Sequence, residues 1–167
     1  TLNFKPVRDE VIKKYLMEEL HVPDYQAEVS VAFAQGNVGK AKQIATAEDF
    51  TEMMDAAFRI LKRGQDMEVY EMVDAIKLLS EQKHTIYEYL ALYLVWFRDV
   101  LMFKATRQID GLVFRQEYND IKSRADRSSY EGLEKIIQAI ETAKARLQAN
   151  VNFDLTMELL FLTIREN

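Results

Sequence analysis

The stretch from Thr85 to Lys104 constrains the fold of this chain more than any other part of the sequence. It is apolar almost all round a helical wheel, and its most apolar run, Tyr89 to Phe97, has nine uncharged residues between Glu88 and Arg98. A membrane-spanning helix needs about 20 apolar residues, so this run is too short to cross a bilayer. A helix that is apolar on every side must be surrounded by other elements. We therefore expect a central core helix.

The composition favours helices in the rest of the chain as well. Only five glycines and two prolines occur among 167 residues, which leaves few positions for tight turns and favours long helices over many short strands. We predict an all-α fold with a small three-helix domain followed by a helical bundle. The absence of cysteine excludes disulfides, thiol nucleophiles and cysteine-based zinc sites, and it favours a cytoplasmic location.

The first 46 residues are predicted to form the small three-helix domain. Arg8 to Leu20 has helical spacing of apolar residues, and Pro23 suits the first turn of a second helix that runs to about Ala34. Gly36 can end that helix in a left-handed conformation, and a third helix follows to about residue 45.

Residues 47–167 are predicted to form the bundle, beginning with Thr46 as an N-cap before Glu48 and Asp49. The first helix of the bundle ends at Gly64. Asp66 is expected to cap the next helix, whose apolar stripe consists of Val69, Met72, Val73, Ile76 and Leu79.

The second half of the bundle contains the most loop-like stretch of the chain, Arg107 to Arg115, followed by a short helix over Gln116 to Arg124. Ser128 with Glu131 matches a capping box and predicts the start of another helix. The segment 150–152 breaks that helix, and Phe153 to Ile164 predicts a strongly apolar last helix.

The charges are unevenly distributed and argue against direct contact with nucleic acid. The chain has 22 basic and 27 acidic residues, a net charge of −5. The first 45 residues have six of each, so the remaining 16 basic and 21 acidic residues carry the whole excess. An acidic surface repels phosphates, so the larger part of the chain is a poor candidate for binding DNA.

No pattern predicts a catalytic, cofactor or metal site. The segment from Gly36 to Ala41 resembles a phosphate-binding P-loop, but alanine stands at positions 34 and 41 and the preceding segment has helical spacing. It is better explained as a helix end followed by a helix start. His21 and His84 are far apart in the sequence, and zinc needs three or four protein ligands. The aromatic residues around Trp96 (Tyr87, Tyr89, Tyr93 and Phe97) are predicted to lie in the core.

The last helix has more apolar residues than one buried face needs. Such a surplus predicts an interface with another protein, while the alternative is a fully enclosed C-terminal helix. The residues predicted to form the interface are Phe153, Met157, Leu160, Phe161 and Ile164.

Three blocks of sequence together resemble the delta-prime family of clamp-loader subunits of bacterial DNA polymerase III, which are AAA+ relatives. The opening resembles the exit from an AAA+ core strand into the lid domain. A glycine-containing block resembles the sensor-2 region of the lid, and the ending resembles the closing helices of the collar. The blocks are Leu2–Val7 with Val11–Leu16, Ala32–Ala41, and Leu147–Asn152 with Leu155–Leu162.

The resemblance implies a lid at residues 1–46 and a helical collar at residues 47–167 that joins the subunits of the loader. ATP-hydrolysing relatives carry an arginine on the sensor-2 helix. Here Gly39 stands at that position, within a sensor-2-like segment that contains Gly36, Gly39 and Lys40. The expected function is therefore subunit assembly in DNA replication without ATP hydrolysis. The implied partners are the delta and gamma/tau subunits, while the sliding clamp and primed DNA are reached only through the full complex.

Three alternatives remain at this point. Within the family, the chain could be a gamma/tau or delta subunit, although a motor subunit should keep the sensor-2 arginine. Outside the family, it could be an unrelated helical adaptor that binds a partner helix. An enzyme with a site built from scattered carboxylates is the most distant possibility.

Overall fold

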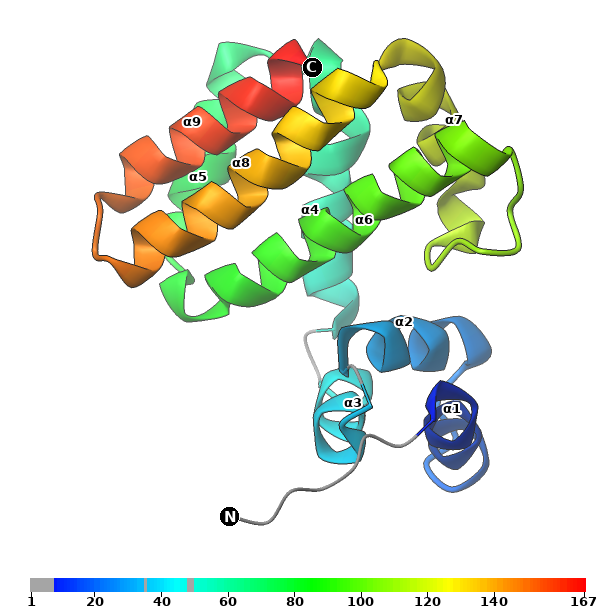
Figure 1. Ribbon diagram of the computed structural model, residues 1–167. Coiled ribbons are helices and arrows are strands. Elements are labelled where there is room, and N and C mark those ends of the chain that lie inside the picture. Colours follow the sequence, from blue (N-terminus) through cyan, green and yellow to red (C-terminus); the bar gives the residue numbers. More distant parts are fainter. Residues whose placement is uncertain (1–7, 35, 48–49) are drawn as a thin grey trace. The chain divides into compact units, whose positions relative to one another are not determined.

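The computed structural model describes residues 8–34, 36–47 and 50–167. The opening strand-like segment and the first-turn carboxylates Glu48 and Asp49 lie outside these ranges. Every regular element within them is a helix, so the predicted all-α fold is confirmed (Figure 1). The chain divides into two compact units, Thr1–Met54 and Asp55–Asn167. The two units are described separately.

The first unit consists of three short helices, α1 (Asp9–Glu18), α2 (Asp24–Ala34) and α3 (Val38–Ala45). Gly36 has a φ of 85°, the left-handed conformation predicted for the end of the second helix. The side chain of Asn37 then caps α3 by accepting a hydrogen bond from the backbone N–H of Lys40 at 3.0 Å. The three helices share a core of eight buried residues: Ile12, Leu16, Val22, Ala27, Val31, Ala34, Ala41 and Ala45.

The second unit is a bundle arranged around α6 (Ile86–Thr106). It contains most of α4 (Phe50–Arg63), followed by η1 (Gly64–Asp66), α5 (Val69–Ser80) and η2 (Lys83–Thr85) before α6. After α6 come η3 (Arg115–Glu117), α7 (Tyr118–Arg127), α8 (Tyr130–Gln148) and α9 (Phe153–Glu166). Helices α7 and α8 pack directly against α6, α9 packs against α8, and α5 packs against α9 (Figure 1).

The predicted central helix is confirmed. Ten of the 21 residues of α6 are buried, and they face several neighbouring elements. The ring of Trp96 lies 5.5 Å from that of Phe58 on α4 and 5.9 Å from that of Phe114, between centroids. The predicted aromatic core is therefore present, except that Tyr87 is 41% exposed.

A buried carboxylate on α6 fixes the loop that follows this helix. Asp99 is 3% exposed, and its two oxygens accept hydrogen bonds from the backbone N–H groups of Val113 at 3.0 Å and Phe114 at 2.8 Å. Phe114 is thereby held in the core, where it is 0% exposed. The predicted loop is confirmed over residues 107–114, while Arg115 is the first residue of η3. A carboxylate from the preceding helix orders this loop.

Two predicted helix caps are wrong, each by a short distance along the chain. The N-cap of α5 is Glu68 rather than Asp66, because the turn η1 uses residues 64–66 and α5 begins only at Val69. The N-cap of α8 is Ser129, whose hydroxyl accepts a hydrogen bond from Gly132 N–H at 2.9 Å. Ser128 instead follows α7 directly, and its hydroxyl accepts a hydrogen bond from the side chain of Arg124.

The predicted stripe of α5 is also only partly correct. Met72, Ile76 and Leu79 are buried as predicted. Val69 and Val73 are 58% and 59% exposed, because α5 packs mainly against α9 and buries only one narrow face. The helix is therefore apolar on a side that this unit does not cover.

Replacement of Asp99 by alanine should destabilise the second unit by about 3 kcal/mol, since the change leaves two backbone N–H groups near the core without their acceptor. Denaturant unfolding of the Asp99→Ala chain measures this loss. Asp110→Ala is the matched control, because Asp110 is an exposed carboxylate of the same loop and its removal should change stability by less than about 0.5 kcal/mol. Equal stability of the two variants would refute the assigned role of Asp99.

Candidate subunit interface

The residues predicted to form an interface on α9 lie mostly inside the second unit. Met157, Leu160, Phe161 and Ile164 are each at most 1% exposed. Phe153 is half-buried, and the amine of Lys83 lies 5.3 Å from the centroid of its ring. The four buried side chains therefore serve the core of the bundle. The exposed large apolar residues of α9 are Leu155 at 51% and Leu159 at 40%.

The greater concentration of exposed apolar residues is on α5. Four large apolar side chains of this 12-residue helix are exposed: Val69 (58%), Tyr70 (67%), Val73 (59%) and Leu78 (43%). We call these four residues the α5 ridge. Single exposed apolar residues are common on soluble proteins, but a group of them on one helix is typical of a protein interaction surface.

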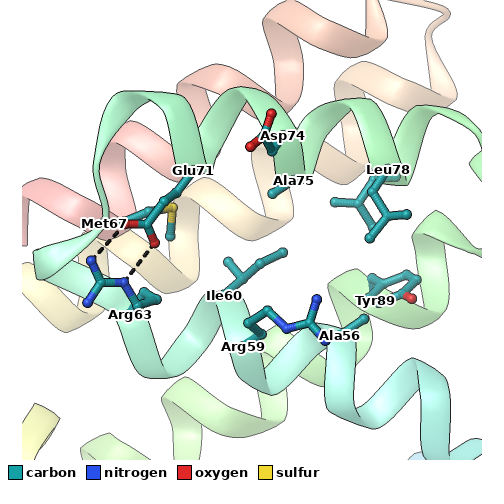
Figure 2. Close-up of a pocket in the computed structure, with 11 residues that line it drawn as sticks. Ala56, Arg59, Ile60, Arg63, Met67, Glu71, Asp74, Ala75, Leu78 and Tyr89 are labelled. Atoms are coloured by element: carbon teal, nitrogen blue, oxygen red, sulfur yellow. Dashed lines mark hydrogen bonds and ion pairs between the residues drawn. The ribbon is translucent and has the colours of Figure 1, made fainter.

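One side of the ridge borders a groove between α4 and α5, shown in Figure 2. The groove has a volume of about 280 Å³. Arg63 donates two hydrogen bonds of 2.7 Å to the carboxylate of Glu71 across one end, and these bonds hold the pKa of Glu71 below its usual value. The apolar part of its lining consists of Ala56, Ile60, Met67, Ala75, Leu78, Leu79 and Tyr89.

The walls of this groove carry charges of opposite sign. Arg59 lies on the α4 side and Asp74 on the α5 side, and both side chains are exposed (Figure 2). Neither forms an ion pair with any residue that the structure describes. A bound segment would therefore find an apolar surface with one free positive and one free negative group beside it.

The other side of the ridge borders a second groove, between α5 and α9, with a volume of about 460 Å³. Val69 and Val73 of the ridge line it together with Leu162 of α9. Lys77, Asp154 and Glu158 supply its charged groups. The α5 ridge thus has an apolar groove on each side. This shape can interlock with the ridges of partner helices.

The sensor-2-like segment lies in the first unit, at the end of α2 and the start of α3. The prediction that Gly36 to Ala41 is a helix end followed by a helix start is confirmed. Gly39 is exposed in the first turn of α3, and Lys40 is exposed beside it. The nearest atom to a Cβ built on Gly39 would be the Asn37 side-chain oxygen at 3.5 Å, so a larger residue would fit there.

Among the described residues, no three histidine, aspartate or glutamate side chains come together in a way that could hold a metal ion. Within the same ranges, none of the helices has both the length and the apolarity required to cross a membrane.

Comparison with known proteins identifies the class to which this bundle belongs. The model of the family described as DNA polymerase III, delta subunit, C terminal, matches residues 61–166, which is more than half of the chain. The chain therefore belongs to this family of C-terminal domains. The matched range begins within α4 and ends in α9, so it includes the α5 ridge and the groove between α5 and α9. Of the groove between α4 and α5, the lining residues Ala56, Arg59 and Ile60 precede the matched range.

A curated relative gives a more specific likeness. DNA polymerase III subunit delta′ of Bacillus subtilis (strain 168) is 26% identical over 169 residues, which cover 99% of this chain and 50% of the relative. The chain thus spans about half the length of that protein. No solved structure matches the chain significantly. The family and this relative confirm the predicted resemblance to the clamp-loader subunits of bacterial DNA polymerase III, and they argue against an unrelated helical adaptor.

Proposed function

We propose that this chain joins clamp-loader subunits into one complex for DNA replication, and that the α5 ridge is its contact surface. The observation that carries the proposal is the exposure of four large apolar side chains on one helix that is bordered by two grooves. Burying apolar surface of this kind is the main source of affinity in stable protein interfaces. A patch of about 800 Å² per partner is enough for a specific contact.

The proposed partners are the other clamp-loader subunits, delta and gamma/tau. The acidic excess after residue 45 disfavours a direct contact with DNA, so the sliding clamp and primed DNA are reached only through the full complex in the cytoplasm. Arg59 and Asp74 on the groove walls favour a partner helix that places an acidic residue near α4 and a basic residue near α5. Such charges affect specificity and orientation more than affinity.

We assign residues 1–46 as a lid of the AAA+ type and residues 47–167 as the collar. The division of the chain into a three-helix unit and a larger bundle supports this assignment. In this arrangement the sensor-2-like segment with Gly36, Gly39 and Lys40 belongs to the lid, and the α5 ridge belongs to the collar.

This chain is expected neither to bind nor to hydrolyse ATP, because Gly39 has no side chain that could reach a phosphate. Calorimetric titration of the 167-residue chain with Mg-ATP should give no saturable heat at micromolar concentrations. Saturable binding that is lost in Lys40→Ala would show that the segment holds nucleotide, and this part of the proposal would then fail.

Tyr70→Lys and Val73→Lys should each weaken binding to the collar regions of the other clamp-loader subunits at least tenfold, because a lysine cannot be buried in an apolar contact without a partner. Both positions are exposed on a helix, so the melting temperature should stay within about 2 °C of the original. Co-purification and calorimetry at low and high salt provide the measurement. An apolar contact should persist when the salt concentration is raised.

Ala145→Lys is the matched control for these variants, since it adds the same charge at an exposed position of α8 and should leave binding unchanged. If the ridge variants bind as tightly as the original chain, the contact surface lies elsewhere. If the chain binds no other subunit and instead shifts primed DNA at physiological salt, the assembly role itself is wrong.

A further inference from the structure

Helix α9 has a row of leucines on the side that faces away from the core of the second unit. Leu155 is 51% exposed, Leu159 is 40% exposed and Leu162 is half-buried. The steps of four and three residues between them place the three side chains along one line of the helix. This spacing is also that of the core positions of a coiled coil. We call these three leucines the α9 seam.

The α9 seam lies between two grooves. Helix α8 packs on one side of α9 and helix α5 on the other (Figure 1). Leu159 lines the groove between α8 and α9, which has a volume of about 670 Å³. Leu162 lines the groove of about 460 Å³ between α5 and α9. A row of side chains with a groove on each side is the kind of surface against which the ridges of another helix pack.

The two grooves differ in the sign of their excess charge. The groove between α8 and α9 is lined by two basic residues and one acidic residue, whereas the groove between α5 and α9 is lined by one basic and two acidic residues. These residues are Lys135, Arg146 and Glu166 in the first groove, and Lys77, Asp154 and Glu158 in the second. Within the described ranges, none of the six forms an ion pair. Their charges are therefore available to a partner.

The backbone chemistry of both grooves selects a helix as the occupant. The walls are helices, whose N–H and C=O groups are bonded within each helix. An extended segment would find no backbone partners there, and its own N–H and C=O groups would lose water without replacement. A helix satisfies its backbone groups internally and can bury one apolar face against the α9 seam. Ala139, Thr142 and Ala143 line the α8 side with small side chains, which lets such a helix approach closely.

We propose that the α9 seam binds an amphipathic helix of a partner protein, whose acidic flank lies along α8 and whose basic flank lies along α5. The apolar face of that helix covers the three leucines, and the opposite charges of its flanks set the direction in which it lies. Val69 and Val73 of the α5 ridge also line the second groove, whereas Tyr70 and Leu78 line neither. The contact is therefore separable by mutation from that of the α5 ridge.

The probe is a synthetic peptide of about 15 residues with three leucines at the same four- and three-residue spacing, glutamates along one flank and lysines along the other. A side-chain cross-link on its outer face keeps so short a peptide helical. The control peptide has the same composition and the same leucines, but glutamate and lysine alternate along both flanks. Each peptide is titrated into the ¹⁵N-labelled 167-residue chain, and binding is followed by nuclear magnetic resonance.

The first peptide should shift amide resonances of α8 and α9 along a saturable curve, with an affinity at least threefold higher than that of the control peptide. A spin label at its N-terminus should broaden resonances at one end of α9 only, either near Asn152 or near Glu166, because the charged flanks fix its direction. The label on the control peptide should broaden resonances at both ends. Absence of a saturable shift at α9, or the same affinity and broadening for both peptides, would contradict the proposal.

Variants of the chain locate the contact. Leu159→Gln should weaken binding of the first peptide at least tenfold, while its melting temperature should fall by no more than about 4 °C because the side chain is partly exposed. In the double variant Lys135→Gln, Arg146→Gln, the preference for the first peptide over the control should disappear, because the groove beside α8 loses its positive excess.

Tyr70→Lys is the matched control on the α5 ridge and should bind the first peptide as tightly as the original chain. Failure of the α9 seam is thereby distinguished from failure of the α5 ridge. Full affinity in Leu159→Gln, or loss of peptide binding in Tyr70→Lys, would show that the helix lies elsewhere and that the proposal is wrong.

Discussion

The second unit depends on one constraint, which is that a helix with apolar residues on nearly every side must be covered on nearly every side. Helix α6 has this property, and the other elements meet the requirement in different ways. Helices α7 and α8 pack along it directly, α4 contributes the ring of Phe58, and the following loop contributes Phe114. The carboxylate of Asp99 accepts hydrogen bonds from two backbone N–H groups of that loop. A polar side chain of α6 therefore positions one of the apolar residues that cover this helix.

The same constraint explains why α5 is left with exposed apolar residues. Helix α9 lies between α8 and α5, and α5 buries only Met72, Ile76 and Leu79 within the unit. Because α5 is in the outer layer of the bundle, its remaining sides face outward. Val69, Tyr70, Val73 and Leu78 therefore have no cover within the unit. Covering them with other subunits is the physical basis of the proposed assembly role.

The positions of the helices could be predicted from the sequence more accurately than the residues that cap them. The all-round apolarity of α6, the glycine at 64 and the break at 150–152 each depend on local chemistry, and each appears where it was expected. The caps at Asp66 and Ser128 were misplaced because several residues near each helix start have suitable side chains. Local sequence does not decide which of them lies at the boundary.

The candidate site could not be predicted because it depends on tertiary packing. Helices α5 and α9 both carry more apolar residues than one face needs, and only the packing order shows that Met157 and Phe161 of α9 are enclosed while Tyr70 and Val73 of α5 are not. The burial of Arg124 could not be predicted either, because α7 is rich in charged residues and an arginine on such a helix is usually solvated. Its burial follows from the positions of Phe97 and Ile164, which are distant in sequence.

The central claim, that the α5 ridge is the surface covered in the assembled clamp loader, is tested most directly by hydroxyl-radical footprinting with mass spectrometry. The method measures side-chain exposure, and the aromatic ring of Tyr70 is a reactive probe that is 67% exposed in the isolated chain. On mixing with the other clamp-loader subunits, oxidation of Tyr70 and Leu78 should fall several-fold. Oxidation of Tyr130 on α8, which is 46% exposed, should not change. Undiminished oxidation of Tyr70 in a complex that has demonstrably formed would contradict the account.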